Sequence, residues 1–188
     1  MRLRLQFDRV LRVFEMQRDE VLTEAAKIEL TLEMLIKNWR SLRRVDIVEK
    51  ANICKALFEG VIFEGAQKKK DDDGSPPVVS FTQDAPFIYA GFMMDYGIDL
   101  YKQVGRRGAM DWRLFLALFR GLSEKTKMRE IMGIRARPLP KATKYNQEEI
   151  HALREAKAFY RVRLTEEEAH RNLQKGIAGL AQMLTQGR

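Results

Sequence analysis

Cysteine and histidine are scarce in this sequence: its 188 residues include one cysteine, Cys54, and two histidines, His151 and His170. A single cysteine cannot form an internal disulfide, which agrees with a reducing compartment. The histidines stand nineteen residues apart, so the His pair at i and i+4 that would suggest zinc is missing. Cys54 falls on the apolar face of a predicted helix, where a thiol stays protonated and inert. We therefore expect no metal site and no cofactor.

The sequence also lacks the glycine patterns that cradle phosphates, since it contains neither GxxxxGK[ST] nor GxGxxG after a strand. Asp95 and Asp99 could be offered as paired carboxylates for acid–base work. With Gly97 between them, they are better explained as caps of a helix end or as partners of Arg106 and Arg107. We expect no catalytic residues and a protein that is not an enzyme.

Long apolar runs are missing as well. No stretch approaches the roughly 18 to 20 apolar residues of a membrane-spanning helix. The first residues, MRLRLQFDRVLR, carry an arginine every few positions where a signal peptide has an apolar centre. We therefore expect a cytoplasmic protein with no membrane contact. Its 45% of hydrophobic residues are enough to bury a core.

Positive charge is concentrated in one region of the chain. The formal net charge is +8, and residues 101–144 hold 12 Lys or Arg against 3 Asp or Glu. A region this basic attracts polyanions or acidic protein surfaces. The alternative is a solvated helix face that binds nothing, which is the commoner reason for a charge run.

The N-terminal region, residues 1–64, is predicted to contain a helical hairpin. Its first twenty residues fit a half-buried strand and a helix about equally well, and the helical spacing is favoured. Thr23 then has the character of an N-cap, and an apolar stripe continues for more than four turns to Trp39. Asp46 and Glu49 form a capping pattern that starts a second helix after a short connection.

Residues 65–79, with the sequence GAQKKKDDDGSPPVV, are predicted to be an exposed and mobile linker. Nothing in this segment can pack, and its two adjacent prolines cannot continue a helix. Its three aspartates do not predict a cation site, because a flexible run beside three lysines offers neither rigid ligands nor net charge.

The stretch from Asp84 to Arg135 is rich in aromatic residues and should hold the core. Asp84 is the expected cap of a helix that carries Pro86 in its first turn. A second helix starts at Trp112, and the two are separated by a basic GRRGA loop. The predicted core residues lie at helical spacing on these two helices: Ile88, Phe92, Tyr96, Leu100, Trp112, Phe115 and Phe119.

Two further helices complete a predicted core domain over residues 80–163. Ser123 should open the first of them, and Asn146 with Glu149 should cap the second, whose apolar stripe runs to Phe159. Residues 164–188 are predicted to form a separate C-terminal helix that either docks on a partner or frays, with a narrow apolar seam that includes Leu173, Ile177 and Leu180. The fold class is thus mainly α, with about six to seven helices and a possible short N-terminal strand or hairpin.

The spacing within this central stretch resembles a known family. The shared features are an Asp followed by Ile88, Tyr89 and Phe92, then Tyr96-Gly97-Ile98-Asp99-Leu100, a Trp112-Arg-Leu-Phe115 helix, Ile131-Met132 and Ile134-Arg135. They resemble the siphophage tail assembly chaperones, which are usually encoded beside the tape-measure protein. The resemblance covers about residues 80 to 161. The chain departs from the family at Asp111, where a His is common, and in residues 165–188, which have no counterpart.

The resemblance implies a non-enzymatic chaperone in the cytoplasm of an infected bacterium. Its expected partners are the tape-measure protein, the major tail tube protein and further copies of itself. We expect partner contacts at Arg106, Arg107, Arg113, Arg120, Leu173, Ile177 and Leu180. Two alternatives stay open. One is a small basic helical protein that binds nucleic acid, and the other is a structural component of the finished tail.

Overall fold

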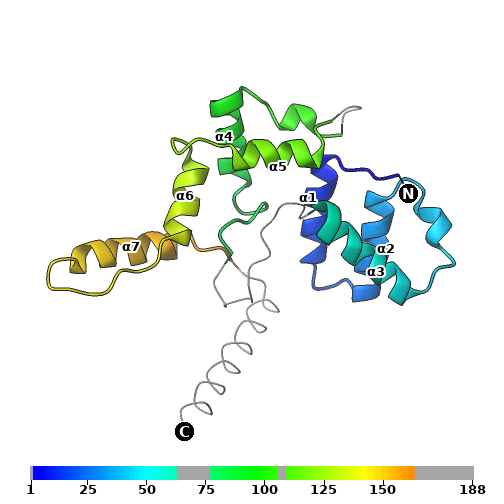
Figure 1. Cartoon of the computed structure of the whole chain (residues 1–188), viewed down its shortest axis with the longest axis horizontal. Helices are drawn as coiled ribbons and strands as arrows, with labels where there is room; N and C mark the ends of the chain where they lie inside the picture. Colours follow the sequence, from blue (N-terminus) through cyan, green and yellow to red (C-terminus); the bar gives the residue numbers. More distant parts are fainter. Residues whose placement is uncertain (1, 63–76, 106–108, 164–188) are drawn as a thin grey trace, which may run out of the picture. The chain divides into compact units, whose positions relative to one another are not determined.

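Helices dominate the computed structural model, which describes residues 2–62, 77–105 and 109–163 (Figure 1). The described residues form seven α-helices: α1 (Phe7–Gln17), α2 (Glu24–Leu35), α3 (Ile47–Leu57), α4 (Ala85–Tyr96), α5 (Trp112–Arg120), α6 (Lys127–Ala136) and α7 (Gln147–Phe159). The predicted mainly α class is confirmed. None of these helices is long and apolar enough to cross a membrane.

The chain divides into two compact units. The first contains the described residues up to 62 together with 92–105 and 109–122, and the second contains 77–91 and 123–163. The first unit therefore takes its residues from two separate parts of the sequence, and so does the second. Most of the predicted linker and all of the predicted C-terminal helix lie outside the described residues.

The first unit begins with an extended segment that hydrogen-bonds on both sides. Leu3 forms an antiparallel bridge with Ile36, and Gln6 forms another with Asp111. The backbone N–H of Trp112 donates to the carbonyl of Leu5 at 2.6 Å. The first twenty residues therefore contain both an extended segment and a helix, because α1 follows this segment directly at Phe7.

Helix α2 is shorter than predicted. The Thr23 side chain accepts the N–H of Ala26 as an N-cap, as expected, but the helix ends at Leu35. Ile36 is extended because it pairs with Leu3. Trp39 lies in a separate short 3₁₀ helix, η1 (Trp39–Leu42). The predicted four-turn stripe therefore breaks where a strand pairing from a distant part of the chain replaces the last helical turn.

Helix α3 begins where the sequence predicts, and it packs against α2. The Asp46 side chain accepts the backbone N–H groups of Val48 and Glu49. Lys50 of α3 is buried and forms an ion pair with Glu29 of α2. A single π-helical turn, η2 (Phe58–Ile62), follows α3.

Stacked aromatic rings form the core of the first unit. The Phe115 ring lies 5.2 Å from the ring of Phe7 and 5.2 Å from that of Phe92, measured between centroids. Trp112 and Phe119 stack on the same ring at 5.4 and 6.3 Å. Side chains from α1, α4 and α5 thus meet around Phe115, and offset stacking of this kind adds to the gain from burial.

A buried ion pair between Asp84 and Arg135 lies at the centre of the second unit. Arg135 donates from both terminal nitrogens to the two carboxylate oxygens, at 2.6 and 2.8 Å. It also donates to the carbonyls of Val78 and Tyr160, and Asp84 accepts the N–H of Ser80. Asp84 stands at the N-cap position of α4, as predicted, and its backbone carbonyl accepts the N–H groups of Phe87 and Ile88. Its charge also holds α6 and the end of α7 to residues 78–84, which the sequence did not predict.

Helix α6 starts later than predicted, whereas α7 starts where predicted but without the expected side-chain cap. Helix α6 begins at Lys127 with Thr126 as its N-cap, because the Thr126 hydroxyl donates to Ser123 and accepts from Arg129. Asn146 stands at the N-cap position of α7, but its side chain accepts the N–H of Thr143 instead.

Candidate protein-interaction surfaces

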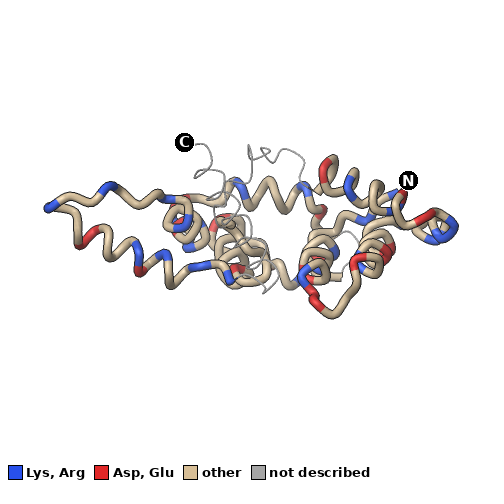
Figure 2. The backbone as a smooth tube through the Cα atoms, turned by 90° about the horizontal axis from the view of Figure 1, so that it is seen from below, with Lys and Arg blue, Asp and Glu red and all other residues tan. Residues whose placement is uncertain are grey.

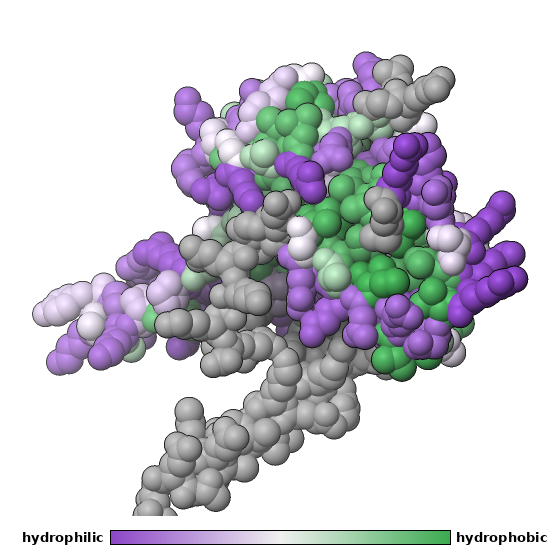
Figure 3. All heavy atoms as spheres, turned by 45° about the vertical axis from the view of Figure 1, so that its right-hand side comes forward, coloured by the Kyte–Doolittle hydropathy of each residue, from purple (hydrophilic) through white to green (hydrophobic). Residues whose placement is uncertain are grey.

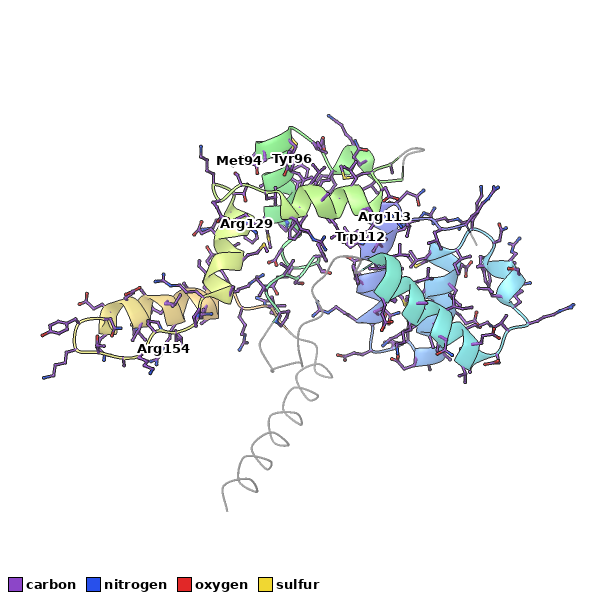
Figure 4. The ribbon with its side chains drawn as sticks, viewed as in Figure 1. Met94, Tyr96, Trp112, Arg113, Arg129 and Arg154 are labelled. Carbon is purple, nitrogen blue, oxygen red and sulfur yellow. The ribbon has the colours of Figure 1, made fainter. Side chains whose placement is uncertain are left out.

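The outer face of α5 combines basic and apolar side chains. Trp112, Phe115 and Phe119 point into the core, which leaves the opposite face of the helix in solvent. This outer face consists of Arg113, Leu114, Ala117 and Arg120, all of them exposed. Figure 4 labels Arg113 beside Trp112 at the N-terminal end of α5. A helix held rigidly from behind by stacked rings can present such a face to another helix at low entropic cost.

Apolar side chains are exposed elsewhere in the first unit as well. Met93 and Met94 near the end of α4 are 42% and 60% exposed, and Tyr101 in η3 (Tyr101–Gln103) is 77% exposed. Figure 3 shows hydrophobic residues gathered in patches between hydrophilic ones on the visible face. The sequence analysis did not predict that these three side chains are exposed. Methionine adapts its shape to different partners, so these positions suit a contact that forms and breaks.

The predicted site residues fall into three groups. The partner-binding candidates Arg106, Arg107, Leu173, Ile177 and Leu180 lie outside the described residues. Arg113 and Arg120 lie on the outer face of α5. Of the seven core candidates, Phe92, Leu100, Trp112, Phe115 and Phe119 are buried in the first unit, where Tyr96 is half-buried, and Ile88 is buried in the second.

Much of the basic charge between residues 101 and 144 is neutralised locally. Lysines, arginines and acidic residues alternate along the chain in Figure 2. Ion pairs join Lys102 to Asp99, Lys127 to Glu130, Arg129 to Glu124, Arg135 to Asp84 and Arg137 to Glu149. Cations that already face a carboxylate attract a polyanion less strongly. The structure thus weakens the argument for a broad nucleic-acid surface.

Asp99 and His151, two of the polar side chains considered above for catalysis or metal binding, lie in the described part of the chain. The Asp99 carboxylate accepts the backbone N–H groups of Tyr101 and Lys102 at the start of η3. Gly97 precedes it with a φ of +64°, a conformation that suits glycine. His151 is exposed and faces Glu155 at 3.6 Å. His170 lies outside the described residues.

Cys54 is buried between α2 and α3, and its thiol donates to the carbonyl of Ile28. Burial, and to a lesser degree the charge of Glu29, raises the pKa of the Cys54 thiol from 9.0 to about 11. A thiol with a pKa this high is a poor nucleophile near neutral pH.

We expect native Cys54 to react with a thiol reagent at pH 8 at least about a hundredfold more slowly than in the unfolded chain. Because the folded pKa exceeds the unfolded one, the thiol's contribution to stability is complete below pH 9 and is lost as the pH rises through about 11. Denaturant unfolding between pH 8 and pH 11 measures this loss. A Cys54→Ala variant should lack that part of the pH dependence, and equal pH profiles for the two proteins would contradict the assignment.

The second unit has a pocket of about 490 Å³ near the end of α7, lined by Gln83, Ala158, Phe159, Arg161 and Arg163. The Gln83 amide donates to the carbonyl of Arg161 and accepts the N–H of Arg163, much as a neighbouring strand would. Phe159, predicted on the apolar stripe of α7, is instead 80% exposed. The Phe159 side chain therefore faces solvent at this pocket and is not part of the core.

A family model described as "Bacteriophage Gp15 protein" matches residues 1–162. No curated protein matches the chain, and no solved structure matches it. The matched range takes in the N-terminal eighty residues, where the resemblance noted from sequence was weak.

Proposed function

Because the chain belongs to the bacteriophage family described as Gp15 protein, we propose that it is a tail assembly chaperone that binds the tape-measure protein. In this role it has no enzymatic activity and acts in the cytoplasm of the infected host. The family match carries the proposal, since it covers most of the chain and points to a structural or assembly role in a phage. The finer assignment also draws on the resemblance between residues 80 and 161 and the tail assembly chaperones.

The outer face of α5 supports the proposal physically. A tape-measure protein is long and helical, and it must be covered until tube subunits replace its chaperone. Such a cover needs contacts of moderate strength that can be displaced. Leu114 supplies an apolar anchor, with Arg113 directly before it in the sequence and Arg120 nearly two turns further along the helix. Exposed charges of this kind contribute little energy each and are easily exchanged.

Co-expression with the tape-measure protein tests the proposal. We expect the two proteins to co-purify, and we expect the triple variant Arg113→Gln, Leu114→Ser and Arg120→Gln to retain about a tenth of the partner, because it removes the anchor and both charges from α5. The matched control is Arg40→Gln, Arg44→Gln and Val48→Ser, which changes exposed residues of the same types elsewhere in the first unit. Equal retention in both variants would remove α5 from the interface, and no co-purification with the wild-type chain would overturn the chaperone assignment.

A structural component of the tail is the nearest alternative, and mass spectrometry of purified virions separates the two. A chaperone should be absent from the finished particle, whereas a structural component stays in it. Nucleic-acid binding is tested by a gel shift over a range of salt concentrations, because binding through several phosphates weakens steeply as salt rises. The local ion pairs of the basic segment lead us to expect no shift.

A further inference from the structure

The outward surface of the N-terminal extended segment forms a basic pocket. Leu3 and Leu5 alternate with Arg4 and Gln6 along this segment, and Leu3 packs against the apolar cluster of α2 and α3. The pocket, of about 410 Å³, is lined by Arg4, Gln6, Arg9, Lys37 and Asp111 together with Leu3, Leu5 and Ala109. All of these residues belong to the first unit.

Backbone pairing fixes the floor of this pocket. The backbone N–H of Arg4 donates to the carbonyl of Leu35, and the backbone N–H of Lys37 donates to the carbonyl of Arg2. On the other edge, Phe7 donates its backbone N–H to Met110. The segment therefore lies between two neighbouring stretches of extended chain. The side chains above it extend from a backbone whose position is set before any ligand arrives, which lowers the cost of ordering them.

Three cations converge on this pocket with little to neutralise them. One terminal nitrogen of Arg4 reaches the Lys37 carbonyl at 3.4 Å, which holds the guanidinium in place. Neither Arg9 nor Lys37 has an ion-pair partner in the part of the chain that the structure describes. This differs from the segment 101–144, where carboxylates face many of the cations. An anionic group is the natural ligand for this arrangement.

Two hydrogen-bond acceptors at the same place limit which anion fits. Gln6 Oε1 is buried without a hydrogen-bond partner among the described residues, and Asp111 contributes a carboxylate to the lining. Asp111 Oδ1 accepts the backbone N–H of Arg113 as the N-cap of α5, so Gln6 Oε1 and the second oxygen of Asp111 are the acceptors that an N–H donor of a ligand would satisfy. A phosphodiester backbone has no such donors, and no aromatic ring lines the pocket for a base to stack on. A polypeptide offers an N–H at nearly every residue and a carboxylate at each Asp or Glu.

We infer that the pocket of Arg4, Gln6, Arg9, Lys37 and Asp111 binds an acidic side chain of a partner polypeptide, with the carboxylate against the three cations and peptide N–H groups toward the two acceptors. This inference rests on the proposed function, because it assigns an acidic segment to the protein that is bound. It adds a second contact point on the first unit, distinct in chemistry from the basic and apolar outer face of α5.

Fluorescence anisotropy with purified full-length chain and labelled hexaglutamate tests the pocket directly at low salt. We expect the variant Arg4→Gln, Arg9→Gln and Lys37→Gln to lose about tenfold or more in affinity. The control Arg12→Gln, Arg40→Gln and Arg44→Gln removes the same charge from exposed positions of the same unit and should stay within about twofold. Hexaglutamine should bind neither the wild-type chain nor the variants.

Equal losses in the two variants would show that only net charge matters, and no loss in the pocket variant would show that the peptide binds elsewhere. Either result overturns the inference, as does a labelled oligo-dT that binds more tightly than hexaglutamate and is lost only in the pocket variant. Circular dichroism of each variant confirms that it is folded. The measurement needs no tape-measure protein, so its failure and a failed co-purification are separate results.

Discussion

Replacing Trp112 with alanine is expected to destabilise the first unit by about 3–5 kcal/mol, the range for a large aromatic side chain removed from a core. The Trp112 side chain is 1% exposed and stacks on Phe115, with the Phe14 ring 5.8 Å away on another side. Its indole N–H also donates to the carbonyl of Ile62 at 2.9 Å. The truncation leaves a cavity and an unpaired buried carbonyl together, so both penalties apply. Denaturant unfolding followed by tyrosine fluorescence or circular dichroism measures the change.

Two companion variants separate these penalties. Trp112→Phe keeps most of the ring volume but removes the N–H, so it should cost about 1–3 kcal/mol through the Ile62 carbonyl. Leu114→Ala, on the exposed face of the same helix, should cost less than about 1 kcal/mol beyond helix propensity. If Trp112→Ala unfolds at the same denaturant concentration as the wild-type chain, the aromatic rings do not form the core.

Breaking the ion pair between Asp84 and Arg135 should cost the second unit about 3–5 kcal/mol, since the remaining charge is left buried without its partner. The Asp84 side chain is fully buried and that of Arg135 is 6% exposed. We expect Asp84→Asn to show this loss, because a neutral amide cannot balance the guanidinium and presents its N–H₂ group to a donor. Thermal and denaturant unfolding measure it.

The pair of Arg137 and Glu149 provides the matched control. Both side chains are more than half exposed, and their N–O distance of 2.8 Å is similar to that of the buried pair. Glu149→Gln should therefore change stability by less than about 1 kcal/mol. Similar losses from Asp84→Asn and Glu149→Gln would show that the buried pair has no special role. A loss in Asp84→Asn that is recovered by Arg135→Met would identify the uncompensated charge as its cause.

Helix caps that depend on neighbouring residues could be predicted from the sequence, whereas pairings between residues far apart in the chain could not. The caps at Thr23 and Asp46 depend on residues two or three positions away, and the structure places both as predicted. The end of α2 depends on Leu3, which lies more than thirty residues before Ile36, and no local pattern reveals that pairing. The partnership of Asp84 with Arg135 spans 51 residues. The sequence therefore predicts the position of Asp84 at the start of α4, but not its ion pair with Arg135.

The same contrast between local patterns and distant contacts applies to the interaction surfaces. Helical periodicity separated the buried side of α5 from the side that carries Arg113 and Arg120, because one helix contains all the information needed. The basic pocket was missed, because Arg4, Lys37 and Asp111 come from three parts of the chain. Only the two bridges of the extended segment bring them together.

The same two bridges set an order for folding during synthesis. The backbone N–H of Trp112 donates to the carbonyl of Leu5, so a ribosome must release α5 before the start of the chain can reach its final place. Until then Phe7 and Phe14 on α1 lack the α5 rings that they contact. Translation that stops before α5 would leave a nascent product with this face of α1 open to other chains, which makes α5 the element whose arrival closes the first unit.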